Sequence, residues 1–301
     1  MKITLKDGSV KEYGQSMAVI DVARDLSEGL ARVATCAKVD GEVKDLRTVL
    51  DKDCELEILT FDSEEGKGAF NHTASHIMAQ AVKRLYPETK LAIGPSIANG
   101  FYYDLDRETP FTTEDLEKIE AEMKKIVKED LKLERFTRSR DEAVAYFKEK
   151  EEPYKVELVE DLPEGEEISF YSQGEFTDLC AGPHLMSTKA VKAFKLTSLA
   201  GAYWRGDEKN KMLTRIYGVA YPKKSELDDY LHMHPETADA LGKKVASNEK
   251  ERKAISGVQK KAREMAKKVS LNNKKLRDCK IHLSDEKNDR RFDTMIFITE
   301  G

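Results

Sequence analysis

Two short segments, far apart in the sequence, carry side chains that form a site only if the fold brings them together. The first segment, NHTASH, places His72 and His76 four residues apart, and the second, DLCAGPH, contains Cys180 and His184 over a hundred residues later. Residues four apart on a helix share one face, so the first pair projects two imidazoles together. The second pair adds a thiol and a third imidazole beside a Gly-Pro turn. Together the four side chains are the ligand set of a metal site or a hydrolytic site.

Neither pair is specific alone. An isolated HxxxH pair is more often a surface or capping feature than a pair of ligands. Here, three of the chain's six histidines and one of its four cysteines fall in the two segments. The combination therefore indicates a single site more strongly than either pair does.

Length and composition indicate a soluble, cytoplasmic protein. The chain has 301 residues, of which 40% are hydrophobic, so it can bury a sizeable core over two or three domains. It has no apolar run long enough to cross a membrane and nothing that resembles a signal peptide. The four cysteines show no CxxC spacing, and we expect free thiols in a reducing compartment.

The charge changes sign along the chain. Residues 1–231 contain 34 Lys and Arg against 45 Asp and Glu, a net charge of −11, whereas residues 232–301 contain 17 against 11, a net charge of +6. The acidic majority argues against indiscriminate binding of nucleic acid. The break near residue 231 indicates a different origin for the tail.

The first sixty residues predict a small domain in ββαββ order. Two short alternating runs flank Asp7-Gly8, which is a strong hairpin signal. Residues 32–39 and 54–60 have the composition of further strands, and residues 61–70 that of a polar linker. Between the hairpin and these strands, a helix that is expected to stop at Gly29 has four apolar positions: Val19, Ile20, Val22 and Ala23.

A second domain is expected from Asn71 onward. Asn71 can cap a helix that carries His72 and His76, which would place both imidazoles near a positive helix start. The helix has an apolar stripe that would hold it against a sheet, formed by Ala74, Met78, Ala81, Val82 and Leu85.

Three later signals predict scaffold elements. The capping boxes Thr112/Asp115 and Ser139/Glu142 each predict the start of a helix. Residues 168–171, ISFY, predict a strand that leads to the second segment, where the Gly-Pro dipeptide favours a turn.

Four separated stretches resemble the editing domain of bacterial threonyl-tRNA synthetases, and they occur in the same order. They are NHTASHIMAQAVKRLYP, IGPSIANGFYYDLD, FTDLCAGPHL and LAGAYWRGDEKNKMLTRIYG. The ββαββ order before them resembles the ubiquitin-like TGS domain of the same enzymes, although any small β-grasp interaction module has this order. The resemblance implies an α+β chain with a TGS β-grasp domain at 1–62, an editing domain at 63–231 and a helical basic tail at 232–301.

The resemblance also implies the roles of individual residues. The substrate-binding positions are Asp178, which could hold the amino group, and Tyr103 and Arg205, which are secondary candidates for pocket and tRNA contacts. Five positions are expected to be catalytic: His72, His76, Lys155, Cys180 and His184.

The residue types leave the role of metal open. Three imidazoles and a thiolate, from His72, His76, His184 and Cys180, can hold zinc, as a similar quartet does in relatives that edit alanyl-tRNA. The threonyl family is understood to work without zinc. We therefore expect that no cofactor is required, because Lys155 and Asp178 supply charge that a metal would otherwise provide.

The implied reaction is hydrolysis of serine misattached to threonine tRNA. One missing methyl group gives a synthetic site only about 1 to 3 kcal/mol of discrimination, so a second, hydrolytic pocket is needed. The expected partner is tRNA(Thr); neither membrane nor DNA is expected to be a partner. The class II synthetic core is not found after the linker, so no aminoacylation is expected. A competing interpretation is a non-catalytic tRNA-binding or interaction fragment from a fused or misassembled gene.

The tail resembles a different family. After the shared word DDYLHM, it is similar to the B subunit of bacterial type II topoisomerases just before the Toprim domain, with Glu300 at the position of the catalytic glutamate. The later acidic metal ligands are not found, and we expect no topoisomerase activity. We also expect the tail not to pack on the editing domain.

Overall fold

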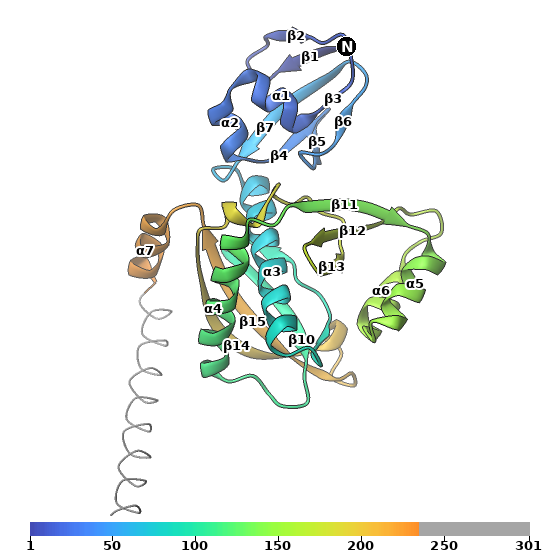
Figure 1. The fold of residues 1–301 in the computed structure, drawn as a ribbon, viewed down its shortest axis with the longest axis vertical. Coiled ribbons are helices and arrows are strands. Elements are labelled where there is room, and N and C mark those ends of the chain that lie inside the picture. The colour runs from blue at the N-terminus through green and yellow to red at the C-terminus, as the bar shows by residue number, and fades with distance from the viewer. Residues whose placement is uncertain (235–301) are drawn as a thin grey trace, which may run out of the picture. The chain divides into compact units, whose positions relative to one another are not determined.

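The computed structural model describes residues 1–234. Residues 235–301 lie outside the described residues, and the expectations for the tail and Glu300 lie there with them. The fold is α+β, as the sequence predicts, with an N-terminal β-grasp-like domain followed by an α+β region (Figure 1).

The N-terminal domain is a five-stranded sheet with a helix packed on it. In spatial order, its strands are β2 (Val10–Glu12), β1 (Lys2–Leu5), β7 (Cys54–Thr60), β4 (Ala34–Val39) and β5 (Glu42–Lys44). Strands β1 and β7 run parallel, and the other neighbours are antiparallel. A short ladder joins β3 (Met17–Ala18) to β6 (Val49–Leu50). The predicted hairpin, the helix and both later strands are therefore confirmed.

The predicted end of the first helix is wrong. Helix α1 (Val19–Leu26) ends before Ser27, and Ser27 then caps a second helix, α2 (Glu28–Val33). The Ser27 hydroxyl accepts hydrogen bonds from the backbone N–H groups of Gly29 and Leu30. Because this cap begins a new helix, Gly29 lies inside α2, and residues 32 and 33 are helical instead of part of the predicted strand.

The second domain has a sheet with helices α3 (Glu64–Leu85) and α4 (Thr113–Glu129) lying side by side against it (Figure 1). The sheet runs β14 (Ala193–Tyr203), β15 (Met212–Tyr221), β10 (Gly100–Asp106) and β8 (Lys90–Leu91), and β9 (Ser96–Ile97) pairs with β10. The stripe predicted on α3 enters the largest core, since Ala74, Met78, Ala81 and Val82 are buried. Helix α7 (Lys224–Met233) follows β15.

A third layer is built from β11 (Leu133–Arg138), β12 (Ile168–Gln173) and β13 (Phe176–Leu179), with α5 (Arg140–Glu149) and α6 (Pro153–Asp161). Both predicted capping boxes are confirmed, at the starts of α4 and α5. The predicted strand ISFY is the first part of β12. Helix α6 brings Lys155 to the site, and β13 brings Asp178.

The expected linker and helix cap before His72 are also wrong. Helix α3 begins at Glu64, and the Ser63 side chain caps it by accepting from Gly66 N. Gly66 is required there, because a Cβ atom would overlap the backbone carbonyl of Thr60. Asn71 is therefore two turns inside the helix, where its amide donates to Lys67 O. The histidines lie mid-helix, so the positive helix start does not act on them.

Within the described residues, no helix is both long and apolar enough to cross a membrane.

Candidate active site

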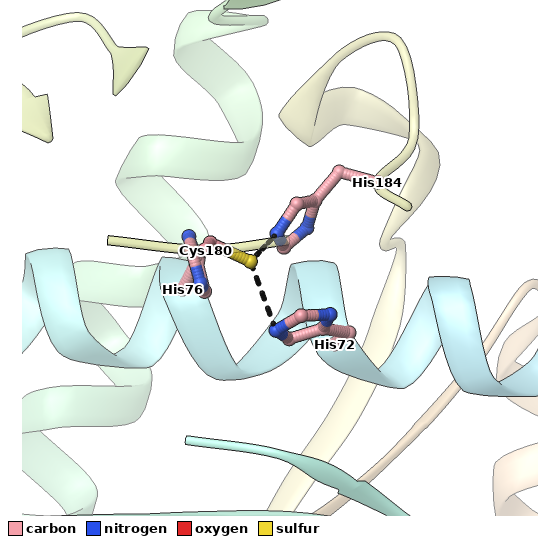
Figure 2. Close-up of side chains that lie close together, drawn as sticks. All are labelled: His72, His76, Cys180 and His184. Carbon is pink, nitrogen blue, oxygen red and sulfur yellow. Dashed lines mark hydrogen bonds between the residues drawn. The ribbon is translucent and has the colours of Figure 1, made fainter. Parts of the chain in front are cut away.

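The fold brings the two sequence segments into one cluster. His72 and His76 extend from α3, and Cys180 and His184 come from the loop after β13 (Figure 2). One ligand atom from each of the four residues lies within 4.8 Å of the others. Cys180 Sγ is 3.3 Å from His72 Nε2 and 3.1 Å from His184 Nε2 (Figure 2). The cysteine sulfur is therefore in contact with imidazoles from both segments.

The loop that carries Cys180 is fixed by its neighbours. Cys180 N donates to Ser169 O, and the Ser169 hydroxyl donates back to Cys180 O, which extends the pairing of β12. Gly182 N donates to Cys180 Sγ over 3.2 Å. Gly182 has φ +78°, and a Cβ atom there would overlap the Tyr171 hydroxyl. Only glycine fits this turn without strain.

The tautomer of His184 follows from its hydrogen bonds. Thr73 Oγ1 lies 3.1 Å from His184 Nδ1, donates to Ala69 O and accepts from Leu185 N. Because the Thr73 hydrogen is used on Ala69, Nδ1 of His184 carries the proton and donates to Thr73. Nε2 is then an acceptor that faces the Cys180 thiol.

Burial keeps the cluster uncharged at neutral pH. It lowers the pKa of His72 to about 4, that of His76 to about 3, and that of His184 well below 6.5. Burial likewise raises the pKa of the Cys180 thiol to about 12. Cys180 is therefore a neutral thiol in the described structure and not a thiolate nucleophile.

A charged group lies next to this neutral cluster. Lys155 Nζ is 2.5 Å from Asp178 Oδ1, and the Tyr103 hydroxyl donates to Asp178 Oδ2 over 2.5 Å. Lys155 Nζ also donates to the Tyr103 oxygen over 3.0 Å. Burial alone would raise the pKa of Asp178, but Lys155 and His76 outweigh it and hold that pKa below its ordinary value. The carboxylate is therefore ionised, and its Oδ2 is 3.7 Å from His76 Nε2.

A cavity of about 320 Å³ adjoins the charged group. Lys155 and Asp178 form part of its wall, and Phe176 and Gln80 form another part. Three cations also line it, Lys83, Arg84 and Lys150. The cavity therefore reaches the Lys155–Asp178 pair, whereas none of the four residues of the histidine–cysteine cluster lines it.

Arg205 is placed differently from the other predicted site residues. Its guanidinium pairs with Asp161 and Glu157 on α6, the helix that carries Lys155. Among the described residues, its polar contacts are with this helix and not with the histidine–cysteine cluster. A role for Arg205 in pocket or tRNA contacts stays a prediction.

Three further residues at the site have no motif in the sequence that marks them. Thr73 contacts His184. In the sequence it lies between His72 and His76, a position that predicts only that it is part of the same helix. Tyr171 packs its ring against His184, with centroids 4.5 Å apart. Asp45, from the N-terminal domain, accepts from the Tyr171 hydroxyl and from His184 N. No sequence motif predicts these contacts, because each of them joins residues that are not neighbours in a helical or strand repeat.

The depressed pKa values predict acid sensitivity. The unfolded chain binds protons at its histidines below their ordinary pKa of 6.5, whereas folded His76 stays neutral down to about 3. Stability from this group is therefore fully present above pH 6.5 and is lost as the pH falls. The expected loss at pH 5 is about 2 kcal/mol for His76 alone. Urea unfolding at pH 7.5, 6 and 5 measures it, and His76→Gln should flatten the curve. An equal slope in the variant would contradict the assignment.

Comparisons with known proteins define the class of the two domains. Residues 1–60 match the TGS domain, and residues 168–217 match the threonyl and alanyl tRNA synthetase second additional domain, the editing-type domain. The chain therefore combines a TGS domain with a domain of the editing type, as the sequence resemblance implied.

Several threonine–tRNA ligases are similar to the N-terminal region of the chain. The threonine–tRNA ligase of Acetivibrio thermocellus is 66% identical over 231 residues, which are 77% of this chain and 36% of that protein. The threonine–tRNA ligase of Caldanaerobacter subterraneus subsp. tengcongensis is 63% identical over 236 residues, 78% of this chain and 37% of the relative. That of Clostridioides difficile is 62% identical over 233 residues, covering 77% and 36%. The N-terminal region of the chain is thus homologous to threonine–tRNA ligases, and the chain spans about a third of their length.

Proposed function

We propose that this chain hydrolyses the ester bond of serine misattached to tRNA(Thr). The observation that carries the proposal is the neutral histidine–cysteine cluster beside the buried ion pair of Lys155 and Asp178. Ester hydrolysis needs a base for water, a positive group near the developing oxyanion and a group that holds the substrate. Lys155 is the positive group and Asp178 the group that holds the substrate. Both contact Tyr103, and the three residues come from three different elements.

His72 is the general base in this proposal. It is the one histidine of the cluster that keeps part of its surface exposed, whereas His76 and His184 are buried. A water held by His72 loses its proton to the imidazole as its oxygen attacks the ester carbonyl. The bond from the carbonyl carbon to the ribose oxygen then breaks, and the imidazole passes the proton to that oxygen, which leaves as the ribose hydroxyl.

The charged group binds and orients the substrate. The Asp178 carboxylate attracts the ammonium group of the seryl moiety, and Lys155 places positive charge near the oxygen that becomes negative. Tyr103, whose pKa is raised well above 10 by burial first and by Asp178 next, stays a neutral donor. The Cys180 side chain packs beside the His72 imidazole and does not attack the ester.

The four cluster residues also fit zinc. The donors are three imidazoles and one thiol, they converge within 4.8 Å, and the buried His76 Nδ1 has no hydrogen-bond partner in the described structure. His72, His76, Cys180 and His184 would hold the ion, which would supply Lewis acidity. We propose that hydrolysis does not require it, because the positive charge of Lys155 lies next to the cluster.

Chelation tests this point. After dialysis against a strong chelator, the protein is expected to keep its hydrolytic rate within about twofold, with less than about a tenth of a zinc ion per chain by elemental analysis. If chelation abolishes hydrolysis and added zinc restores it, the proposal that hydrolysis is independent of metal is wrong.

The central experiment compares two substrates. The full chain is incubated with seryl-tRNA(Thr) and threonyl-tRNA(Thr), and release of each amino acid is measured. We expect faster hydrolysis of the seryl ester, because the second pocket would exclude the extra methyl group of threonine. Equal rates would remove the specificity. Binding of tRNA(Thr) without hydrolysis would favour the non-catalytic fragment. We also propose that the hydrolase is located in the cytoplasm.

A further inference from the structure

We propose that Asp45 and Arg47 of the TGS domain are positioning residues for the site, holding the loop that carries Cys180 and His184. The inference rests on the proposed function for its kinetic consequence, but the contacts themselves belong to the described structure. Asp45 and Arg47 lie between β5 and β6, outside the editing-type domain. Their side chains are 7% and 17% exposed, so both are largely shielded from water.

Arg47 binds the backbone of the editing-type domain at three points. Its Nη1 donates to His184 O over 3.2 Å, and its Nη2 donates to Leu185 O over 2.7 Å. Its Nε donates to Leu133 O, at the start of β11, over 2.9 Å. One planar guanidinium therefore fixes the catalytic loop relative to the neighbouring strand.

Asp45 completes the contact from the same side. Its Oδ2 accepts from His184 N over 3.2 Å and from the Tyr171 hydroxyl over 2.9 Å. Its Oδ1 accepts from Arg47 Nη1 over 2.8 Å, so the two side chains also hold each other. Both the N–H and the C=O of His184 are thus bound by the TGS domain.

The imidazole of His184 is oriented by a second set of contacts. Thr73 Oγ1 accepts a hydrogen bond from Nδ1–H, and the Tyr171 ring, whose hydroxyl donates to Asp45, packs against the imidazole. Asp45 therefore reaches His184 twice, once through its backbone and once through Tyr171. A displacement of about 1 Å at a catalytic group can cost on the order of 100-fold in rate.

These contacts give the TGS domain a role beyond attachment. A domain that only carried tRNA contacts would have no need to bind both backbone groups of a residue in the histidine–cysteine cluster. Positioning and simple structural support differ in what they predict for variants, and the test separates them.

The experiment uses the full chain and three variants. Asp45→Ala removes the acceptor, Asp45→Asn keeps one carbonyl oxygen as a conservative rescue, and Leu56→Ala is the control. Leu56 lies in the core of the TGS domain and does not touch the site, so its truncation loosens the domain alone. We expect Asp45→Ala to lower kcat for seryl-tRNA(Thr) by about 10- to 100-fold with KM within about threefold. Asp45→Asn should fall between it and the wild type, and Leu56→Ala should leave kcat within about twofold.

A second readout does not depend on hydrolysis. Alkylation by iodoacetamide is followed peptide by peptide at three buried free thiols, Cys36, Cys54 and Cys180. Asp45→Ala should speed the reaction of Cys180 by about tenfold relative to the other two, because its loop is released. Leu56→Ala should speed Cys36 and Cys54 instead.

Each outcome decides the proposal. Should the wild type show no hydrolysis, the proposed function fails, and the alkylation pattern still tests the positioning. Selective exposure of Cys180 in Asp45→Ala supports positioning in either case. An unchanged Cys180 rate, or a loss of kcat in Leu56→Ala as large as in Asp45→Ala, overturns it.

Discussion

Replacement of Lys155 with methionine is expected to lower the free energy of unfolding by about 3 to 5 kcal/mol and to abolish hydrolysis of seryl-tRNA(Thr). Lys155 and Asp178 are 4% and 2% exposed, and their closest atoms are 2.5 Å apart. Removing the ammonium leaves a buried carboxylate without its main counter-charge, and the remaining donor, Tyr103, cannot replace it. Urea unfolding at pH 7.5 measures the loss of stability, and single-turnover hydrolysis measures the loss of activity.

The double variant Lys155→Met/Asp178→Asn separates the two effects. It removes the unpaired charge along with the lysine, so it should recover more than half of the lost stability without recovering hydrolysis. Lys124→Met on the exposed face of α4 is the matched control, and its stability should change by less than about 0.5 kcal/mol. Activity that returned with stability in the double variant would show that Lys155 acts only as a structural partner of Asp178.

Replacement of His72 with glutamine is expected to lower the hydrolytic rate by about 100- to 10,000-fold, the range associated with loss of a general base. Glutamine has a similar reach and can contact Cys180, but its amide has no basic nitrogen that could take a proton from water. Because His72 is partly exposed at the edge of the cluster, the fold should tolerate the change. Rates are measured with seryl-tRNA(Thr), and binding of uncharged tRNA(Thr) is measured in parallel.

A matched histidine controls for surface effects. His232 is exposed on α7, and His232→Gln should leave the rate unchanged. Binding of tRNA(Thr) should stay the same in both variants, since the base acts on water and not on the tRNA backbone. A rate within about fivefold of the wild type in His72→Gln would take the base role away from His72.

Local signals in the sequence were sufficient for much of the scaffold. The hairpin at Asp7-Gly8 and the capping boxes of α4 and α5 depend on residues within a few positions of each other, and the structure has all three. The pairing of His72 with His76 follows from the helical repeat in the same way. These features need no knowledge of the rest of the chain.

Local signals failed where a second cap residue stood nearby in the sequence. Asn71 has the residue type of a helix cap, but α3 starts eight residues earlier, where Ser63 caps it and Gly66 allows close approach to Thr60. Gly29 has the type of a helix stop, but Ser27 begins a new helix around it. In both places a serine only a few residues from the predicted position caps the helix instead.

The sequence by itself determined which side chains could do chemistry here: three imidazoles and a thiol in two segments, and the helix that spaces the first pair. Tertiary structure alone decided their charge, because the low pKa values of His72 and His76 come from burial. It also decided which groups contact them. Asp178 binds Lys155 and Tyr103, and Asp45 accepts from His184 N, although no spacing rule connects these segments. Burial and long-range contacts are properties of the packed chain, and a one-dimensional pattern does not contain them.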